Sequence, residues 1–466
     1  MASPLKARAI VDRLISAIEA GLMRPGERLP SVREGARTQG VSKNTLSSAY
    51  DQLVASGYLE ARRGAGYFVA AGPRPTIRSP GPGVEEALDL VSLLREQTEA
   101  RYTARPGEGR PPPAWMEESE LRVHFARAAR LGGSGPAHDY GTTWGYAPLR
   151  ERIALSLQER SIPCAPEQVL LTQGANHALE VIVRHMVEPD DAVLVDDPGY
   201  YPLFGKLRLA RARIIGVRRQ ADGPDLEDLA AKLALVRPKL FFTQSLAHNP
   251  TGGTLSPVVA HGVLQAAERH GFGIVEDDPF ADLLPSSATR LAALDGLRRV
   301  MYVGTFSKTL SASLRVGLVA GMPATVQALA HMKLLMVLAT SQYAERMVAG
   351  LIAGGGQYLR HLRRLRARVE RATDAALVHL AAAGLRPSRP PGGGFYLWTP
   401  LPPGIEEAAS VREAAACGIF LAPGAVFSPE RGPGPAMLRL NVAHTADPRF
   451  LDFLRERLRH ADCQTG

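Results

Sequence analysis

The chain has 466 residues, 45% hydrophobic and 22% charged, a balance typical of a globular protein long enough for two or three domains. It has no apolar run near the roughly 20 residues that span a bilayer and no signal-peptide pattern, and Cys164, Cys417 and Cys463 are too few and scattered for a disulfide framework or a zinc site, so we expect a cytoplasmic protein without a metal. The net charge of +9 is concentrated in residues 1–78, which hold 12 Lys or Arg against 6 Asp or Glu, and this indicates either nucleic-acid binding or a solvated surface.

Changes in composition divide the chain into three segments. Residues 1–70 show dense helical periodicity that ends in a hairpin pattern, which predicts a small N-terminal domain. Residues 71–87 are rich in proline and glycine without an apolar period, as is typical of a linker. Residues 88–466 alternate apolar runs with helices, and their last part, from about 325 to 466, is predicted to form a smaller subdomain.

The N-terminal domain carries the signals of three helices. Apolar residues at helical spacing between residues 5 and 18 predict the first. Ser31 and Glu34 form an S-x-x-E capping box that starts the second, Gly40 ends it, and Ser42 caps the third. Two short helices joined by a tight turn form a helix-turn-helix, whose second helix enters the major groove of DNA.

The start of the third helix is predicted to be exposed and to carry Lys43, Asn44 and Thr45, which can reach phosphates and base edges. The following stretch, YLEARRGAGYFVA, places Arg63 at a hairpin tip that suits a wing. A generic three-helix domain with a polar surface is the simpler interpretation. That interpretation does not require Arg33, Lys43 and Arg63 to lie on one face.

The segments RPGERLPSVRE, VSKNTLSSAYDQL and GYLEARRGAGYFV closely resemble the winged helix-turn-helix of GntR-type regulators. The resemblance implies binding to a double-stranded DNA operator. It places the DNA contacts on the second helix, the start of the recognition helix and the wing tip, at Arg33, Lys43, Asn44, Thr45, Arg63 and Gly64.

Seven apolar runs predict a mainly parallel sheet buried on both faces, because they are continuous and alternate with helical stretches. The last two runs are close together in the sequence, so one edge of the sheet is expected to be antiparallel. A long helical region follows residue 321, and GGGFYLW, IFLAPGAVF and MLRLNVAH indicate a small α+β subdomain. The seven runs are 168–172, 192–196, 213–217, 240–244, 273–277, 300–304 and 316–320.

Two motifs suit a pyridoxal phosphate site. In TFSKTLSASLR, Lys308 lies among small hydroxyl residues with Arg315 seven positions later, so it can form an imine beside an anion site. In VEDD, Asp277 ends a predicted strand and can keep a pyridine nitrogen protonated, which the electron sink of this cofactor requires. A surface lysine and a helix N-cap are the simpler interpretations.

Two further motifs fit the same cofactor. In HNPTG, Asn249 can donate to a phenolic oxygen. In TQGANHA, a strand, a glycine turn and a helix start offer backbone N–H groups to a phosphate, although an ordinary strand-to-helix turn has the same pattern. The four motifs each lie near the end of a predicted strand, and this order favours a cofactor site over four coincidences.

In this order, the motifs resemble the fold-type I aminotransferases over residues 88–460. The resemblance implies an α/β domain that binds pyridoxal 5'-phosphate (PLP) and forms a homodimer. Lys308 would form the Schiff base, Asp277 would pair with the pyridine nitrogen and Asn249 would contact the ring hydroxyl. Tyr200 of DPGYYP would stack on the ring, and Arg439 of LRLN would bind the carboxylate of a small amino compound. The implied phosphate contacts are Ala175, Asn176, Thr305, Ser307, Arg315 and, from the second subunit, Tyr140.

A GntR-like head on such a body is the arrangement of the MocR subfamily of regulators, which the chain resembles over nearly its whole length. The sequence departs from the aminotransferase pattern at two places. In EDDPFADL, Phe280 stands where the family commonly has a tyrosine that donates to the cofactor's ring oxygen, and phenylalanine can pack there but cannot donate. Residues 88–116 lack the Gly-Pro-Asp pattern that usually lines the substrate side of the site.

Two functions fit these motifs. The first is a PLP-binding, DNA-binding transcription regulator whose aminotransferase-like domain senses PLP or an amino compound, with at most weak transaminase activity. The second is an active PLP-dependent aminotransferase that carries an N-terminal helical domain, and a third interpretation treats the head as an interaction module. The complete DNA-binding module and Phe280 favour the regulator.

Overall fold

The computed structural model describes residues 4–19, 23–62, 65–70, 93–116, 121–130, 140–354, 356–387, 393–430 and 434–465. The chain folds into two compact units, Met1–Gly81 and Pro82–Gly466, and each is described by itself. The predicted linker, residues 71–87, lies outside the described residues. Within the described ranges, the helices are too short or too polar to cross a membrane.

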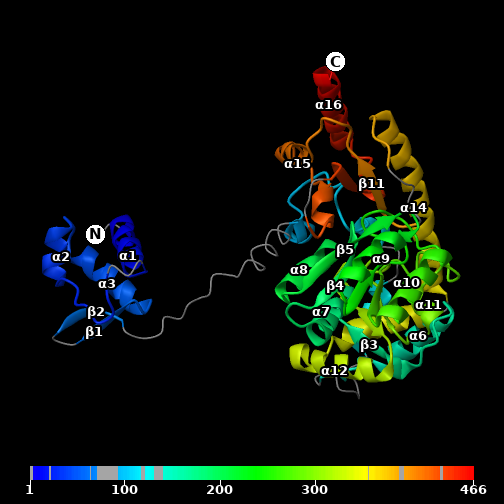
Figure 1. Ribbon diagram of the computed structural model, residues 1–466, viewed down its shortest axis with the longest axis horizontal. Helices are drawn as coiled ribbons and strands as arrows, with labels where there is room; N and C mark the ends of the chain where they lie inside the picture. The colour runs from blue at the N-terminus through cyan, green and yellow to red at the C-terminus, as the bar shows by residue number, and fades with distance from the viewer. Residues whose placement is uncertain are drawn as a thin grey trace. The chain divides into compact units, whose positions relative to one another are not determined.

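Three helices form the body of the N-terminal unit: α1 (Pro4–Glu19), α2 (Val32–Thr38) and α3 (Lys43–Ala55) (Figure 1). Both predicted caps are present, since the side chain of Ser31 accepts the backbone N–H of Glu34 and that of Ser42 accepts the N–H of Thr45. Gly40, in the turn between α2 and α3, has φ +62°, which glycine adopts without strain. The buried face of α3 consists of Thr45, Leu46, Ala49, Tyr50 and Leu53.

The predicted hairpin follows α3. Strands β1 (Leu59–Arg62) and β2 (Gly66–Val69) pair antiparallel, with Leu59 opposite Val69. Tyr67 of β2 packs edge-on against Tyr50 of α3, with ring centroids 4.9 Å apart, and this contact joins the hairpin to the helices. The winged helix-turn-helix is therefore confirmed as a fold, while its tip, with Arg63 and Gly64, lies outside the described residues.

An eight-stranded sheet in the order β3-β10-β9-β8-β7-β4-β5-β6 forms the centre of the larger unit. All seven predicted strands are present, and the short β6 (Gly223–Pro224) adds an eighth. The antiparallel strand β10 lies between β9 and the outermost strand β3, so this edge of the sheet is antiparallel, as expected. The other strands are β3 (Val169–Thr172), β4 (Ala192–Asp197), β5 (Arg213–Gln220), β7 (Leu240–Thr243), β8 (Gly273–Asp278), β9 (Val300–Thr305) and β10 (Gly317–Ala320).

Helices cover both faces of this sheet, as the continuous apolar runs predict (Figure 1). Successive strand residues point to opposite sides, so that Leu170 and Leu171 of β3 belong to different apolar clusters. One cluster includes α6 (Ala147–Gln158), α9 (Leu226–Leu235) and α10 (Pro257–His270). The other includes α7 (Ala175–Met186), α8 (Tyr201–Leu209) and α12 (Pro323–Val337).

The small α+β subdomain is also confirmed. Its sheet has the order β11-β13-β12, and Arg439 lies on the central strand. A bridge between Ala104 and Ile419 attaches residues near 104 to this subdomain. The strands are β11 (Tyr396–Pro400), β12 (Ala422–Pro423) and β13 (Met437–Asn441), and the helices of this part and its approach are α13 (Gln342–Ala353), α14 (Gln357–Ala382), α15 (Glu407–Ala416) and α16 (Pro448–Thr465).

Candidate functional site

The candidate cofactor residues lie at the edge of the large sheet where its parallel strands end. Asp277 is near the end of β8 and Thr305 ends β9, while Asn249 and Tyr200 follow β7 and β4. These four strands run parallel, so their carboxyl ends meet at one edge. The fold thus gathers residues that are far apart in the sequence.

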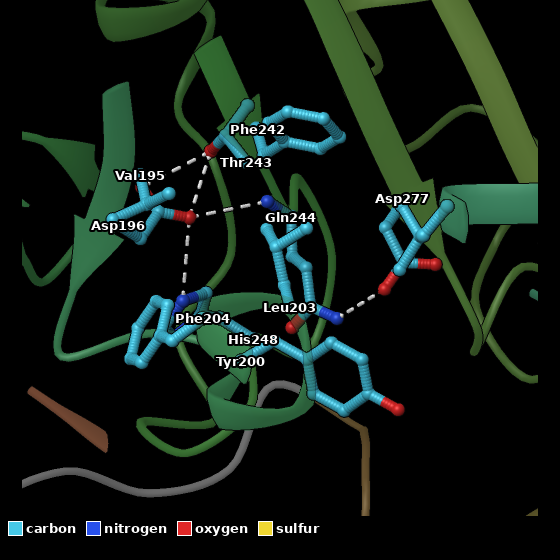
Figure 2. A pocket seen from close by; sticks show the side chains of 11 residues that line it. Val195, Asp196, Tyr200, Leu203, Phe204, Phe242, Thr243, Gln244, His248 and Asp277 are labelled. Atoms are coloured by element: carbon cyan, nitrogen blue, oxygen red, sulfur yellow. Dashed lines mark hydrogen bonds and ion pairs between the residues drawn. The ribbon is translucent and has the colours of Figure 1, made fainter. Parts of the chain in front are cut away.

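Asp277 is buried and has one unpartnered oxygen. Gln244 donates its side-chain N–H to Asp277 Oδ2 at 2.7 Å (Figure 2). Among the described residues, Asp277 Oδ1 has no hydrogen-bond partner. Because a buried acceptor without a donor is costly, this oxygen suits a protonated ring nitrogen. The arrangement therefore fits PLP.

Burial raises the pKa of Asp277 to about 7, although the hydrogen bond from Gln244 opposes this rise. Tyr200 and Asp277 line one pocket, whose other walls are apolar side chains together with the polar residues Asp196, Thr243, Gln244 and His248 (Figure 2). Burial also raises the pKa of Tyr200, so its ring stays neutral. A cationic pyridine nitrogen at this point would favour the charged form of Asp277.

A second buried carboxylate, Asp196, is paired with a cation. It accepts from Arg219 at 3.0 Å. It also accepts from Thr243 at 2.9 Å, and His248 Nε2 lies 3.3 Å away (Figure 2). Burial raises the pKa of Asp196, but Arg219 and His248 outweigh that effect and hold it below its usual range. Burial lowers the pKa of His248 to about 4, so the imidazole is neutral. Arg219 therefore neutralises Asp196.

Lys308 lies between the large sheet and the small subdomain. Its amine donates to the carbonyl of Gly109 and lies 3.3 Å from the hydroxyl of Tyr396. The Tyr396 hydroxyl also donates to the Gly109 carbonyl at 2.8 Å. Tyr396 was not among the residues expected at the site. Its motif, GGGFYLW, indicated only a strand of the small subdomain.

The guanidinium of Arg439 is buried beside Asn249. It donates to Asn249 Oδ1 at 3.2 Å and to the carbonyl of Gly107 at 2.6 Å, and it lies over the ring of Tyr396. Since the Asn249 oxygen accepts from Arg439, the Asn249 amide N–H groups are the atoms left to donate to a ring oxygen. Arg439 Nε has no partner within the described part of the chain.

The residues expected to bind phosphate surround the start of α7. No side chain caps this helix at Gly174, which has φ +78°, so its first backbone N–H groups are available to an anion. Arg315 donates to the Gln173 carbonyl at 2.9 Å and lies 3.5 Å from Ser307 Oγ. Ser307 in turn accepts from Thr305 at 3.1 Å. Ala175 and Asn176 form the first turn of α7.

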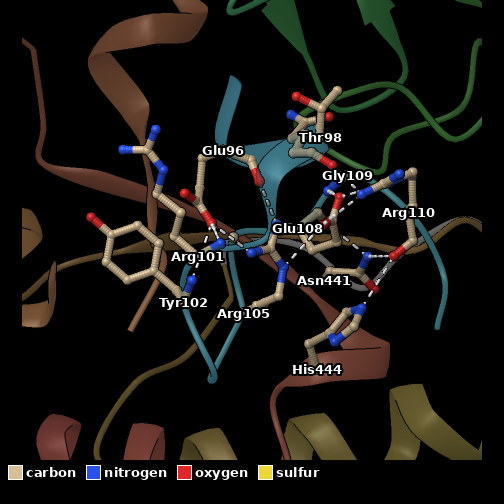
Figure 3. Close-up of polar contacts among 12 residues, drawn as sticks. Glu96, Thr98, Arg101, Tyr102, Arg105, Glu108, Gly109, Arg110, Asn441 and His444 are labelled. Atoms are coloured by element: carbon tan, nitrogen blue, oxygen red, sulfur yellow. Dashed lines mark hydrogen bonds and ion pairs between the residues drawn. The ribbon is translucent and has the colours of Figure 1, made fainter. Parts of the chain in front are cut away.

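A segment before residue 111, consisting of residues 96–110, is held by largely buried ion pairs (Figure 3). Arg105 donates to Glu96 at 2.6 Å and to Glu108 at 2.8 Å, and Arg110 contacts Glu108 at 3.2 Å. Burial raises the pKa of Glu108, but Arg110 and Arg105 outweigh it and lower the pKa. The amide of Asn441 donates to the carbonyls of residues 108 and 110. These contacts hold the carbonyls of Gly107 and Gly109 against Arg439 and Lys308.

Phe280 is fully buried and does not reach a polar partner. Its ring packs edge-on against Phe395 and Tyr396, with centroids 5.3 Å and 5.7 Å away. Position 280 therefore supplies no hydroxyl to the site. Phe280 instead packs against the ring of Tyr396, whose hydroxyl contacts Lys308.

Of the six residues expected to contact DNA, the structure describes four, since Arg63 and Gly64 lie outside the described residues. Arg33, Lys43 and Asn44 are exposed. Thr45, expected to be exposed, is only 4% exposed, because its hydroxyl is 2.8 Å from Ser42 Oγ inside the helix cap. The exposed start of α3 is thus Lys43 and Asn44.

Tyr140 lies on the surface and is 81% exposed. Phe125 and Tyr343 are also exposed, and they line one hollow together with Arg315. Apolar and aromatic side chains thus lie beside Arg315, a residue expected to bind the phosphate.

Two family models match the chain. The model described as aminotransferase class I and II matches residues 103–452, and the model described as bacterial regulatory proteins, gntR family, matches residues 6–69. Together they cover the two compact units found in the structure.

Relatives of both kinds are similar to this chain. The probable rhizopine catabolism regulatory protein MocR of Rhizobium meliloti is 31% identical, over 77% of this chain and 74% of that protein. The uncharacterized HTH-type transcriptional regulator YdcR of Escherichia coli is 27% identical, over 91% of this chain and 92% of that protein. The crystal structure of LysN, an alpha-aminoadipate aminotransferase from Thermus thermophilus complexed with N-(5'-phosphopyridoxyl)-L-leucine, is 28% identical, with a TM-score of 0.72 over 82% of this chain and 97% of that one.

The raised pKa of Asp277 predicts that Asp277→Asn stabilises the cofactor-free protein, and more so as the pH rises from 5 to 8. The folded state holds this proton up to about pH 7, whereas the unfolded state releases it near pH 4, so ionisation costs stability with increasing pH. The gain should reach a few kcal/mol, at about 1.4 kcal/mol per pKa unit. Denaturant unfolding followed by tryptophan fluorescence measures it, because Trp115, Trp144 and Trp398 all lie in the larger unit. An equal difference at both pH values would contradict the assignment.

Proposed function

The chain belongs to the aminotransferase class I and II family and, with its gntR-family head, to the MocR subfamily of GntR-type regulators, and on that premise we propose that it is a cytoplasmic transcription regulator that binds DNA and PLP. The observation that carries the proposal is that one chain holds a complete winged helix-turn-helix and a PLP-type site with an unpartnered buried carboxylate oxygen.

The residues of the site suit the parts of PLP. When bound, the cofactor supplies an aldehyde that joins to a lysine amine and a ring that withdraws electrons. Asp277 would hold the ring nitrogen, Asn249 the ring oxygen and Lys308 the aldehyde carbon, with Tyr200 against the ring. The start of α7, with Ala175, Asn176, Thr305, Ser307 and Arg315, would bind the phosphate.

We propose that the large domain senses an amino compound with a carboxylate. In the structure, backbone carbonyls of Gly107 and Gly109 accept from Arg439 and Lys308. An effector would replace these contacts with its carboxylate and would compete for the position of the lysine amine. Such a ligand shifts a conformation only through its different affinity for two arrangements, and the segment at Gly107–Gly109 supplies that difference.

The wild-type protein incubated with PLP should turn yellow, and Lys308→Ala should lose the visible band and its sensitivity to borohydride. Lysine is the group that joins covalently to the aldehyde, so removal of the amine leaves the cofactor without that bond. Lys239→Ala is the matched control, since this lysine lies at the surface paired with Asp191 and should keep the band. A wild type that stays colourless would refute the cofactor assignment.

The same preparations separate a regulator from an enzyme. Operator affinity should change on addition of PLP or of candidate amino acids, while turnover with a keto-acid acceptor stays well below about one per second, the lower end of the ordinary enzyme range. Turnover in that range, together with operator affinity that PLP and amines leave unchanged, would favour the aminotransferase.

Lys43→Ala and Arg33→Ala should each make the salt dependence of operator binding shallower by about one unit, because each removes one phosphate contact. Asn44→Ala should instead reduce discrimination between operator sequences, since an amide can read a base edge. Gln52→Ala is a suitable control, because Gln52 is exposed on the same helix, α3, but near its other end. Unchanged binding by all three variants would show that the recognition helix has been misplaced.

The protein should sediment as a homodimer, with Tyr140 of one subunit near the phosphate bound by the other. The apolar surface around Phe125 and Tyr343, beside Arg315, supports this proposal, because a second copy would cover it. Phe125→Asp should shift the protein toward the monomer, whereas Leu235→Asp, at an 85% exposed leucine on α9, should not. Tyr140→Phe should remain dimeric and bind PLP more weakly. A stable wild-type monomer that binds PLP would rule out the shared site.

A further inference from the structure

Gln244 is hydrogen-bonded to both Asp277 and Asn249, the two residues expected to contact the cofactor ring. Its side-chain N–H donates to Asp277 at 2.7 Å, and its side-chain oxygen accepts the backbone N–H of Asn249 at 2.8 Å. Its own backbone N–H donates to Asp196 at 3.2 Å. Gln244 is 4% exposed, so water does not substitute for these bonds. One side chain thus joins the carboxylate expected at the ring nitrogen to the loop expected at the ring oxygen.

The orientation of this amide is fixed by its surroundings. The Asn249 N–H can only donate, so the oxygen of Gln244 must face it and the NH₂ group must face Asp277. Asp277 Oδ2 is therefore occupied, and Oδ1 is the oxygen that remains without a partner in the described structure. The amide leaves one carboxylate oxygen for the cofactor.

The charge of Gln244 matters as much as its geometry. A cation at this position would compete with a protonated ring nitrogen for the charge of Asp277. The nearby cation Arg219 is instead paired with Asp196 at 3.0 Å. Gln244 supplies a hydrogen bond without a charge, so the carboxylate keeps its full attraction for the ring nitrogen.

Building on the proposed PLP site, we propose that Gln244 is a positioning residue, which acts through Asp277 and Asn249 to set the affinity for the cofactor and the protonation of its ring nitrogen. None of the four sequence motifs includes it as a cofactor residue, because its role rests on hydrogen bonds to Asp277 and Asn249 that only the fold shows. Its role depends on the packing of β7 beside β8.

The test compares Gln244→Met, Gln244→Glu and wild type by PLP dissociation constant and by pH titration of the visible band. Gln244→Met keeps the volume but removes both hydrogen bonds, so PLP should bind about tenfold more weakly or worse, as expected for a lost hydrogen bond to a charged group. The pH at which the visible band changes should also shift from that of wild type.

Gln244→Glu gives a signature that a merely structural role would not. The new carboxyl keeps an oxygen for the Asn249 N–H and can donate to Asp277 only while it is protonated. Binding should therefore be close to wild type at low pH and should weaken with rising pH more steeply than in wild type. The other charged or titratable groups around the pair are the same in all variants. They are Lys308 on the cofactor side, Asp278 next to Asp277 on β8, and Arg219, Asp196 and His248 around Gln244.

Gln168→Met is the matched control. Gln168 also bridges two backbone groups of the same unit, donating to the Gly321 carbonyl at 3.0 Å and accepting the Ala165 N–H at 3.1 Å, but it lies away from the ring contacts. It should lower stability and leave PLP affinity within about twofold, since hydrogen bonds remote from a site contribute to folding and not to binding. If wild type binds PLP and Gln244→Met matches it in affinity and titration, the inference is wrong while the proposed function stands. If wild type fails to bind PLP, the proposed function itself fails.

Discussion

A buried carboxylate that lacks one hydrogen-bond donor is the constraint on which the site depends. Asp277 ends up in the interior because β8 is a central strand, and burial alone makes its charge unfavourable. Gln244 satisfies one oxygen and leaves the other open. A cationic ring nitrogen resolves this imbalance, so the surrounding protein is built to be completed by a cofactor.

The segment before residue 111 supplies the second constraint. Its ion pairs are internal to the segment, with Glu108 between Arg105 and Arg110. They fix the carbonyls of Gly107 and Gly109, which accept from Arg439 and Lys308, the two residues expected to bind an effector. Breaking one member of such a buried pair is costly, so the segment should move as a unit. The proposed sensor needs such a change between two arrangements.

The hydroxyl groups near Lys308 bear on whether the protein is a regulator or an active aminotransferase. Phe280 removes one hydroxyl that tunes aminotransferase sites, and Tyr396 places another beside the lysine amine. The second hydroxyl contacts the lysine and the Gly109 carbonyl, so it holds the lysine amine and this carbonyl together. The site therefore retains the groups expected to hold a cofactor, and its lysine contacts the segment that the proposed effector would displace.

The sequence by itself determined the two domains' folds, the seven strands and the motif residues Asp277, Asn249 and Lys308, because hydrophobic period, caps and strand-end motifs are local properties of the chain. It overstated the exposure of Thr45, since the inward turn of a side chain depends on neighbours that local patterns do not reveal. Gln244, Tyr396 and the carbonyls of Gly107 and Gly109 became site groups only in the tertiary structure. The contacts that define them join positions 33 apart for Gln244 and Asp277, 88 apart for Lys308 and Tyr396, and 332 apart for Arg439 and Gly107, and contacts between such positions leave no pattern in a single sequence.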